Sequence, residues 1–250
     1  MYPQRMVSQS LRLGLLVTLL VLVLSACGGD ERFSKPQPLP EEQQQLRTGV
    51  YRSEEFKPSL TFRVGEGWSN LPPEAIDTLF IVQGETRRIG FVNAFDVYKP
   101  TRTGALNAVE APKDMVGWFQ QHPYLQTDKP EPVTVGGVKG MQVDVVVEDL
   151  PEDHYGVCGS ECVDLFANFS TVSALPVFLV EGDKMRLIVL EEHNLPVPRT
   201  SFVGREREKL EEEYMKGFGA KITYTSPATE FDEFAPEAQS VLDSVEWTGS

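Results

Sequence analysis

The sequence is poor in histidine, cysteine and basic side chains. Its 250 residues include 3 His and 3 Cys, and 23 basic side chains stand against 37 acidic ones, for a formal net charge of −14. Nucleic-acid affinity depends mainly on clustered Lys and Arg, so this balance argues against nucleic acid as a partner. Three cysteines in a chain of this length also exclude a disulfide-dense miniprotein.

Motifs that carry common enzyme chemistry are missing as well. The sequence has no P-loop, no G-x-G-x-x-G fingerprint and no G-x-S-x-G nucleophile elbow. Paired carboxylates such as Asp232 and Glu233 are adjacent in sequence, whereas an acid/base pair has to converge across a cleft. We therefore predict a protein that is not an enzyme and that uses no cofactor or metal.

Long apolar runs are confined to the N-terminus. Residues 13–24 are apolar except for Gly14 and Thr18, and they follow the positive charges of Arg5 and Arg12, with no acid before Asp30. A membrane-spanning helix needs about 20 apolar residues. The shorter run is typical of the hydrophobic region of a secretory signal.

The residues that follow this run indicate how the protein is anchored. Leu24-Ser25-Ala26-Cys27 resembles a bacterial lipobox, which implies a lipoprotein signal peptide over residues 1–26, cleavage before Cys27 and diacylglycerol on its sulfur. Two or three acyl chains hold a domain firmly, whereas a single chain binds only marginally. We expect an extracytoplasmic protein anchored to the bacterial cell membrane through acylated Cys27. The alternative is an uncleaved N-terminal anchor with an incidental cysteine.

A tether and one domain are predicted after the signal. Residues 27–48 are polar, with three prolines in five positions (Pro36, Pro38, Pro40) and a run of glutamines, so we interpret them as a semi-rigid spacer. A Pro-rich docking peptide is the alternative, but its aromatic or basic flanks are missing. Residues 49–250 have no repeat and no second linker, and about 200 residues suffice for one substantial core.

Apolar periodicity predicts mainly strands in this domain. Strands are expected at residues 60–64, 79–82, 89–97, 141–147 and 221–225. Two hairpins are expected, one turning at Gly136-Gly137 and one over residues 176–190, turning at 181–183.

Two helices complete the pattern. The first follows Pro112 and stops at Pro123, with Met115, Trp118, Phe119 and His122 on one face. The second has Pro236 in its first turn, an apolar stripe of Ala238, Val241, Leu242 and Val245, and an entry stapled by Phe231 and Phe234. Residues 192–219 interrupt the regular pattern as a charged insertion, read as a solvated helix or alternatively as a partner-docking element.

Four segments suggest a family. They are SLTFRVGEGW, the helix end HPYL, PVTVGGVKGMQVDV and the closing EFDEFAPEAQSVLDSVEW. Together they resemble the PsbP/Mog-type fold and the Lpq-type envelope lipoproteins that contain such domains. The resemblance implies an α+β fold, in which an antiparallel β-sheet packs with helices as an α/β/α sandwich. It also implies a protein that acts by binding other proteins of the envelope.

Cys158 and Cys162 are the strongest local candidates for a functional or structural site. In an oxidising compartment, two cysteines at this spacing most often form a disulfide. The competing interpretation adds His154 and gives H-x3-C-x3-C, with enough ligand types for zinc but not a common zinc spacing. A thioredoxin-like pair would need C-x-x-C.

These observations favour a non-enzymatic, lipid-anchored module that binds a protein partner in the envelope. The alternative is a binding module for a small or apolar ligand, held between the sheet and the helices.

Overall fold

The computed structural model divides the chain into two compact units, Met1–Lys35 and Pro36–Ser250. It describes residues 35–94, 96–103, 107–156, 158–159, 161–167, 177–191 and 220–248. The predicted signal peptide, Cys27 and the charged insertion 192–219 lie outside the described residues. The fold given below is that of the second unit.

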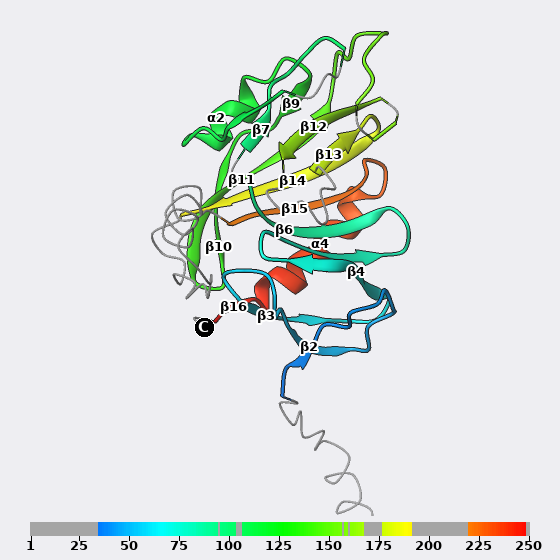
Figure 1. Cartoon of the computed structure of the whole chain (residues 1–250), viewed down its shortest axis with the longest axis vertical. Coiled ribbons are helices and arrows are strands. Elements are labelled where there is room, and N and C mark those ends of the chain that lie inside the picture. The colour runs from blue at the N-terminus through cyan, green and yellow to red at the C-terminus, as the bar shows by residue number, and fades with distance from the viewer. Residues whose placement is uncertain are drawn as a thin grey trace, which may run out of the picture. The chain divides into compact units, whose positions relative to one another are not determined.

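A central antiparallel sheet of eight strands organises this unit (Figure 1). Across the sheet the strands are β10 (Glu131–Val135), β11 (Val138–Val147), β14 (Asp183–Leu190), β15 (Ala220–Pro227), β6 (Arg87–Asn93), β5 (Thr78–Gln83) and β4 (Trp68–Ala75). Strand β9 (Leu125–Thr127) pairs with the far end of β11. The Gly136-Gly137 turn joins β10 to β11 with φ angles of 56° and 80°, which confirms the predicted hairpin.

Side chains that alternate along the strands of the central sheet pack into two separate hydrophobic cores. In β14, Met185 and Leu187 belong to one core, while Ile188 and Leu190 belong to the other. Because successive side chains of a strand point to opposite faces, the central sheet is apolar on both of its faces. Each face therefore needs a covering layer.

The first face is covered by a small sheet and by helix α4 (Phe231–Asp243). The small sheet has the order β1 (Gln37–Pro38), β2 (Gly49–Arg52), β3 (Leu60–Val64) and β16 (Glu246–Trp247). Helix α4 contacts both β3 and β15, and lies between them in Figure 1.

The second face is covered by another small sheet and by helix α2 (Met115–Gln120). This sheet has the order β13 (Val177–Val180), β12 (Cys162–Ala167), β7 (Asp96–Tyr98) and β8 (Ala108–Glu110). The predicted antiparallel sheet is therefore right, but the domain is richer in sheet than an α/β/α sandwich, since each outer layer combines one helix with a small sheet.

Two predicted strand assignments are wrong in their connections. Residues 89–97 form two strands in different sheets, β6 and β7, instead of one. Residues 176–190 do not form a hairpin. Gly182 makes the expected turn with a φ of 90°, but β13 pairs with β12 while β14 joins the central sheet. The turn crosses from one layer to the next, which local sequence does not reveal.

The C-terminal helix begins earlier than predicted. It starts at Phe231, so Pro236 lies inside it and the first-turn acids are Asp232 and Glu233. Phe231 stacks on Tyr224 with ring centroids 5.6 Å apart, and Phe234 lies 6.0 Å from Trp68. Burial of these two rings outweighs the single helical hydrogen bond that Pro236 cannot donate.

The predicted spacer ends earlier than residue 48. Strand β1 pairs in parallel with β2, and Leu46 is buried in the first core. The amide group of Asn70 fixes the segment between them: its Nδ2 donates to the Pro40 and Glu42 carbonyls at 2.7 and 3.0 Å, and its Oδ1 accepts from the Gln44 N–H at 2.9 Å. Residues 36–48 are therefore part of the domain.

Candidate functional site

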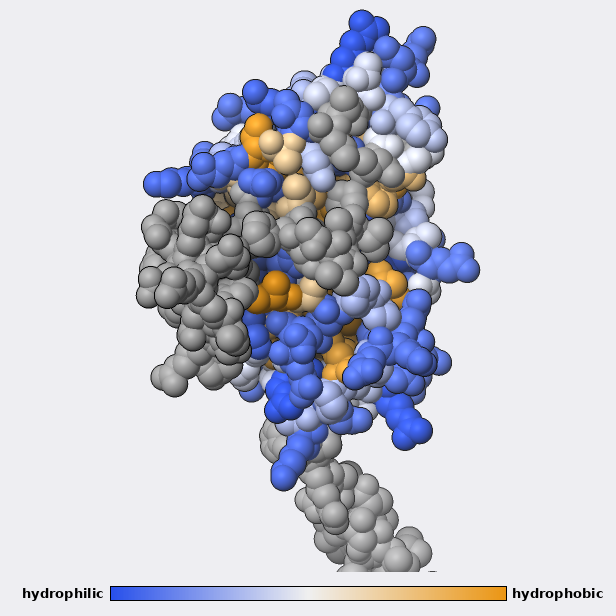
Figure 2. Space-filling model, in the orientation of Figure 1, coloured by the Kyte–Doolittle hydropathy of each residue, from blue (hydrophilic) through white to orange (hydrophobic). Residues whose placement is uncertain are grey.

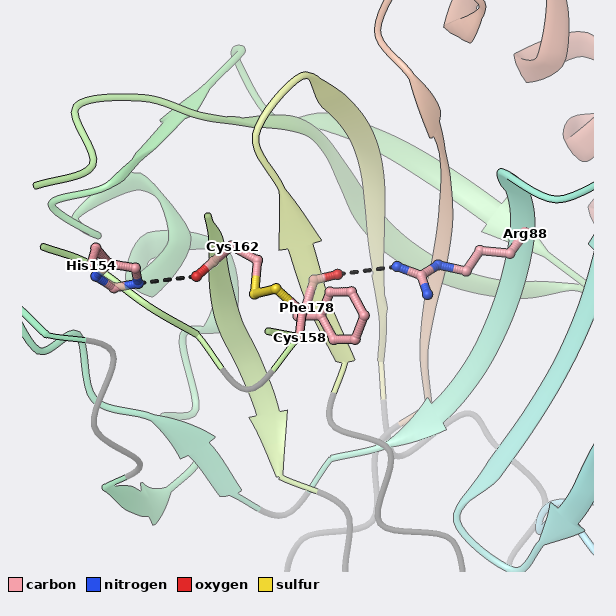
Figure 3. The surroundings of a disulfide bond; sticks show 5 residues. All are labelled: Arg88, His154, Cys158, Cys162 and Phe178. Carbon is pink, nitrogen blue, oxygen red and sulfur yellow. Dashed lines mark hydrogen bonds between the residues drawn. A yellow bond between two sulfur atoms is a disulfide. The ribbon is translucent and has the colours of Figure 1, made fainter. Parts of the chain in front are cut away.

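The loop between β11 and β12 gathers the residues that the sequence singles out. Its described residues are 148–156, 158–159 and 161, and we call it the disulfide loop. Cys158 and Cys162 form a disulfide within it, with their Cα atoms 6.5 Å apart (Figure 3). Cys162 is the first residue of β12 and is fully buried, so the disulfide ties the loop to the edge of the second core.

His154 fixes the same loop from within. Its imidazole is buried, with Nε2 3.0 Å from the Cys162 carbonyl oxygen and Nδ1 3.3 Å from that of Arg102 (Figure 3 draws the first contact). Its backbone N–H donates to the Pro151 carbonyl at 2.9 Å. One side chain thus joins three parts of the chain: the loop, strand β12 and the segment around Arg102.

This geometry does not assemble the zinc site considered as an alternative. The two sulfurs are bonded to each other, and both nitrogens of His154 face carbonyl oxygens, so none of the three side chains presents a lone pair to a metal. No cluster of three or more metal-ligating side chains occurs within the described parts of the chain.

A row of rings leads from helix α2 to the disulfide loop. The centroids of Trp118 and His122 are 5.1 Å apart, those of His122 and Tyr124 are 5.8 Å apart, and those of Tyr124 and His154 are 5.4 Å apart. All three pairs are close to edge-to-face, which is a favourable arrangement of aromatic rings. The row links the loop to the apolar side chains of the second core.

His122 is the neutral member of this row. Its Nδ1 accepts the Tyr124 backbone N–H at 3.3 Å. Burial, and to a lesser extent the charge of His154, lower the pKa of His122 from 6.5 to about 4. The sequence suggested a partly buried bystander on the helix face; the structure places His122 just after the helix, in contact with the site.

Tyr155 is the outward-facing residue of the disulfide loop. It is 64% exposed, although its neighbour His154 is only 6% exposed. Its hydroxyl lies over Gly159, 3.8 Å from the position that a Cβ atom would take there, and Gly159 has a φ of 79°. Two residues before Tyr155 in the chain, Asp153 forms a solvent-exposed ion pair with Arg102 at 3.4 Å. The loop therefore presents a large aromatic side chain from a rigid base.

Arg88 secures the strand next to the disulfide. From β6 of the central sheet, its Nη2 donates to the Phe178 carbonyl at 3.3 Å, and its guanidinium lies 5.1 Å from the centre of the Phe178 ring (Figure 3). Burial lowers the pKa of Arg88, and the charge of Asp183 acts in the opposite direction. Strand β13, which pairs with β12 through Val180 and Cys162, is thereby fixed to the central sheet.

The described surface offers few other large apolar side chains. Tyr155 and Met141 are the exposed large hydrophobic residues of the described segments. In Figure 2, hydrophilic residues cover most of the described part of the face in view, and hydrophobic ones surface in separate small patches. Tyr155 is therefore the most distinctive residue on which to place a contact.

Comparison with solved structures finds PsbP- and Lpq-type proteins. A cyanobacterial PsbP (CyanoP) from Synechocystis sp. PCC 6803 matches with 10% identity and a TM-score of 0.36, over 89% of this chain and 97% of the other. LpqN, which is involved in cell envelope biogenesis of Mycobacterium tuberculosis, matches with 8% identity and a TM-score of 0.33, over 82% of this chain and 90% of the other.

These are the two groups that the sequence resembles, so the comparison of structures recovers the same resemblance. Because both TM-scores lie below 0.5, neither likeness bears on activity or partners. No protein-family model matches the sequence. No curated protein matches it either.

In the described part of the chain, no helix has both the length and the apolar character required to cross a bilayer.

Proposed function

We propose that this protein is a non-enzymatic binding module of the bacterial envelope, held at the membrane by acyl chains on Cys27 and engaging a protein partner through the disulfide loop. The observation that carries the proposal is the exposure of Tyr155 on a loop that a disulfide and the hydrogen bonds of a buried histidine tie to strand β12.

A rigid loop with an exposed aromatic tip suits protein recognition. Tyr is enriched among the residues that contribute most to interfaces, because its ring buries a large area and has few rotatable bonds. Ordering of a mobile loop on binding costs free energy, and a loop that is already ordered avoids this cost. The exposed ion pair of Arg102 with Asp153, a residue of the same loop, supplies polar groups of the kind expected at the rim of an interface.

The cysteine and histidine side chains of the disulfide loop suit a role in binding better than a role in catalysis. A nucleophile or general base needs a free atom within reach of a substrate. Cys158 and Cys162 are joined in the disulfide, and both His154 nitrogens face backbone carbonyls. We therefore assign the loop a recognition role.

The anchor completes the proposal. From Cys27 to the first residue of the domain, Pro36, the chain spans at most about 30 Å when fully extended. The first residue of the domain would then lie within that distance of the membrane.

Mass spectrometry of the protein from the membranes of its own cells tests the anchor. We expect an N-terminal peptide that begins at Cys27 and carries the added mass of acyl chains. An intact leader, or an unmodified Cys27, would refute the anchoring.

Equilibrium binding to washed membranes of the same cells tests the role of the loop. The mature chain from residue 27 with Cys27→Ser, which has neither the leader nor a lipidation site, should bind saturably. Adding Tyr155→Ala should weaken binding by about 30-fold, the usual effect of removing a dominant interface tyrosine. Adding Met141→Ala, a change at the other exposed large apolar residue, should leave binding unchanged. Equal binding by the Tyr155→Ala and Met141→Ala proteins would contradict the proposal.

A further inference from the structure

The position of His154 between two carbonyl groups has a chemical consequence. The Arg102 and Cys162 carbonyl oxygens, at 3.3 and 3.0 Å from its two ring nitrogens, can only accept hydrogen bonds. A neutral imidazole has one N–H and one acceptor nitrogen, whereas the imidazolium donates from both nitrogens. Only the protonated ring satisfies both carbonyls at once.

We propose that His154 is a pH-dependent clamp on the disulfide loop: the imidazolium joins the Arg102 carbonyl to the Cys162 carbonyl, and loss of one proton releases the loop that carries Tyr155. This regulation rests on the proposed role of Tyr155 in binding. Partner binding would then be favoured under acidic conditions and weakened under alkaline ones.

Among the described residues, few other charged and titratable groups lie around His154. From the turn after α2, Tyr124 faces its ring, and His122 contacts the ring of Tyr124. From its own loop and from the segment around Arg102, the charges of Asp153 and Arg102 pair with each other at the surface. From β12, Cys162 contributes only its carbonyl, because its sulfur is in the disulfide.

His122 does not supply the switch. Its pKa is lowered to about 4, so above that pH it is neutral and its Nδ1 stays an acceptor for the Tyr124 N–H. The two buried imidazoles therefore have different roles: His122 accepts, and His154 donates.

Release of the clamp would act directly on the loop. When one proton is lost, one ring nitrogen turns a lone pair toward a carbonyl oxygen, and that contact becomes unfavourable. The disulfide still closes the ring between residues 158 and 162, but residues 149–156 lose one of their two links through His154. Tyr155 lies in the released segment.

Hydrogen exchange on the full-length protein tests the clamp. Protection factors of the loop amides, corrected for the intrinsic effect of pH, are compared at pH 5 and pH 8. We expect about tenfold less protection in residues 149–156 at pH 8, the effect of one lost hydrogen bond to a charged group. Amides of β14 should not change. The difference should vanish in His154→Gln and persist in His122→Asn.

Equal protection at pH 5 and pH 8 in the natural protein would overturn the clamp. If His154→Gln fails to fold, the ¹⁵N shifts of the His154 ring in the natural protein decide instead: two protonated nitrogens at pH 5 support the clamp, and one protonated nitrogen overturns it. The membrane-binding assay separates this outcome from the proposed function. Intact Tyr155-dependent binding without a pH effect refutes only the clamp, while a working clamp without Tyr155-dependent binding refutes only the binding role.

Discussion

The carboxylate of Asp144 accepts two hydrogen bonds from the guanidinium of Arg186, 2.5 Å from Nε and 2.9 Å from Nη2. The pair lies on the face of the central sheet that α4 covers, where Arg186 also stands 5.5 Å from the centre of the Tyr224 ring. Lys184 approaches the same carboxylate at 2.9 Å. Burial alone would raise the pKa of Asp144, but the hydrogen bonds from Arg186 and Lys184 outweigh it, and the pKa is lowered.

Asp144→Asn should therefore destabilise the domain at neutral pH by about 2 kcal/mol, because two half-buried cations lose their common partner. A carboxyl whose pKa is lowered by folding contributes stability above its unfolded pKa, and loses that contribution as the pH falls through its folded pKa. The difference between natural protein and variant, measured by urea unfolding, should thus be large at pH 7 and shrink below pH 4. Asp128→Asn is the control, since Asp128 is mostly exposed and lies 4.0 Å from Lys184. Equal losses for the two variants would contradict the assignment.

His122 should give a pH effect of the same sign, in a higher pH window. Burial first, and the charge of His154 second, lower its pKa from 6.5 to about 4, so between these values the unfolded chain binds a proton that the folded protein does not. Stability from this group falls as the pH drops through that window, by up to about 3 kcal/mol. His122→Asn keeps an acceptor near the Tyr124 N–H but cannot titrate, so its unfolding free energy should depend less on pH between 6.5 and 4. Identical pH dependence of the two proteins would show that folding does not lower the pKa of His122.

The two glycines of the β10–β11 turn should respond differently to alanine. Both have positive φ, which costs a side chain about 1 kcal/mol. A Cβ atom at Gly137 meets open space, but at Gly136 it lies 2.6 Å from Cδ1 of Trp247 and 2.9 Å from the Val245 carbonyl oxygen. Gly136→Ala should therefore cost a further 1–3 kcal/mol or so, the usual range for overpacking. Thermal or urea unfolding that ranks Gly137→Ala as the more damaging change would contradict the contact with Trp247.

Local patterns predicted most of the strands but not their partners. The alternation of Leu60, Phe62 and Val64 and the Gly136-Gly137 turn depend on neighbouring residues, and both appear as expected. Strand β13 pairs with β12, and Arg88 of the central sheet donates a hydrogen bond to the Phe178 carbonyl of β13. Contacts of this kind between layers leave no sequence pattern near the Gly182 turn. For the same reason the docking of residues 36–48 was missed, since it depends on the side chain of Asn70, far along the chain.

Part of the candidate site was likewise predictable from neighbouring residues, and part was not. Cys158, Cys162 and His154 are close in sequence, and their spacing was enough to single them out. The row of rings from Trp118 to His154 depends on the contact of Tyr124 with His154, which lie 30 positions apart, so it could not be found locally. The exposure of Tyr155 follows from the burial of its neighbour His154 between two carbonyls, which is a property of the folded loop.

The most direct test of the account is site-specific photo-crosslinking in native membranes. A photoreactive phenylalanine analogue is placed at position 155 of the full-length, lipidated protein and, as the matched control, at position 141. The account predicts one discrete adduct of defined mass from position 155, competed by unlabelled natural protein but not by Tyr155→Ala, and no such adduct from position 141. Absence of a competed adduct from position 155, or the same set of adducts from both positions, would contradict it.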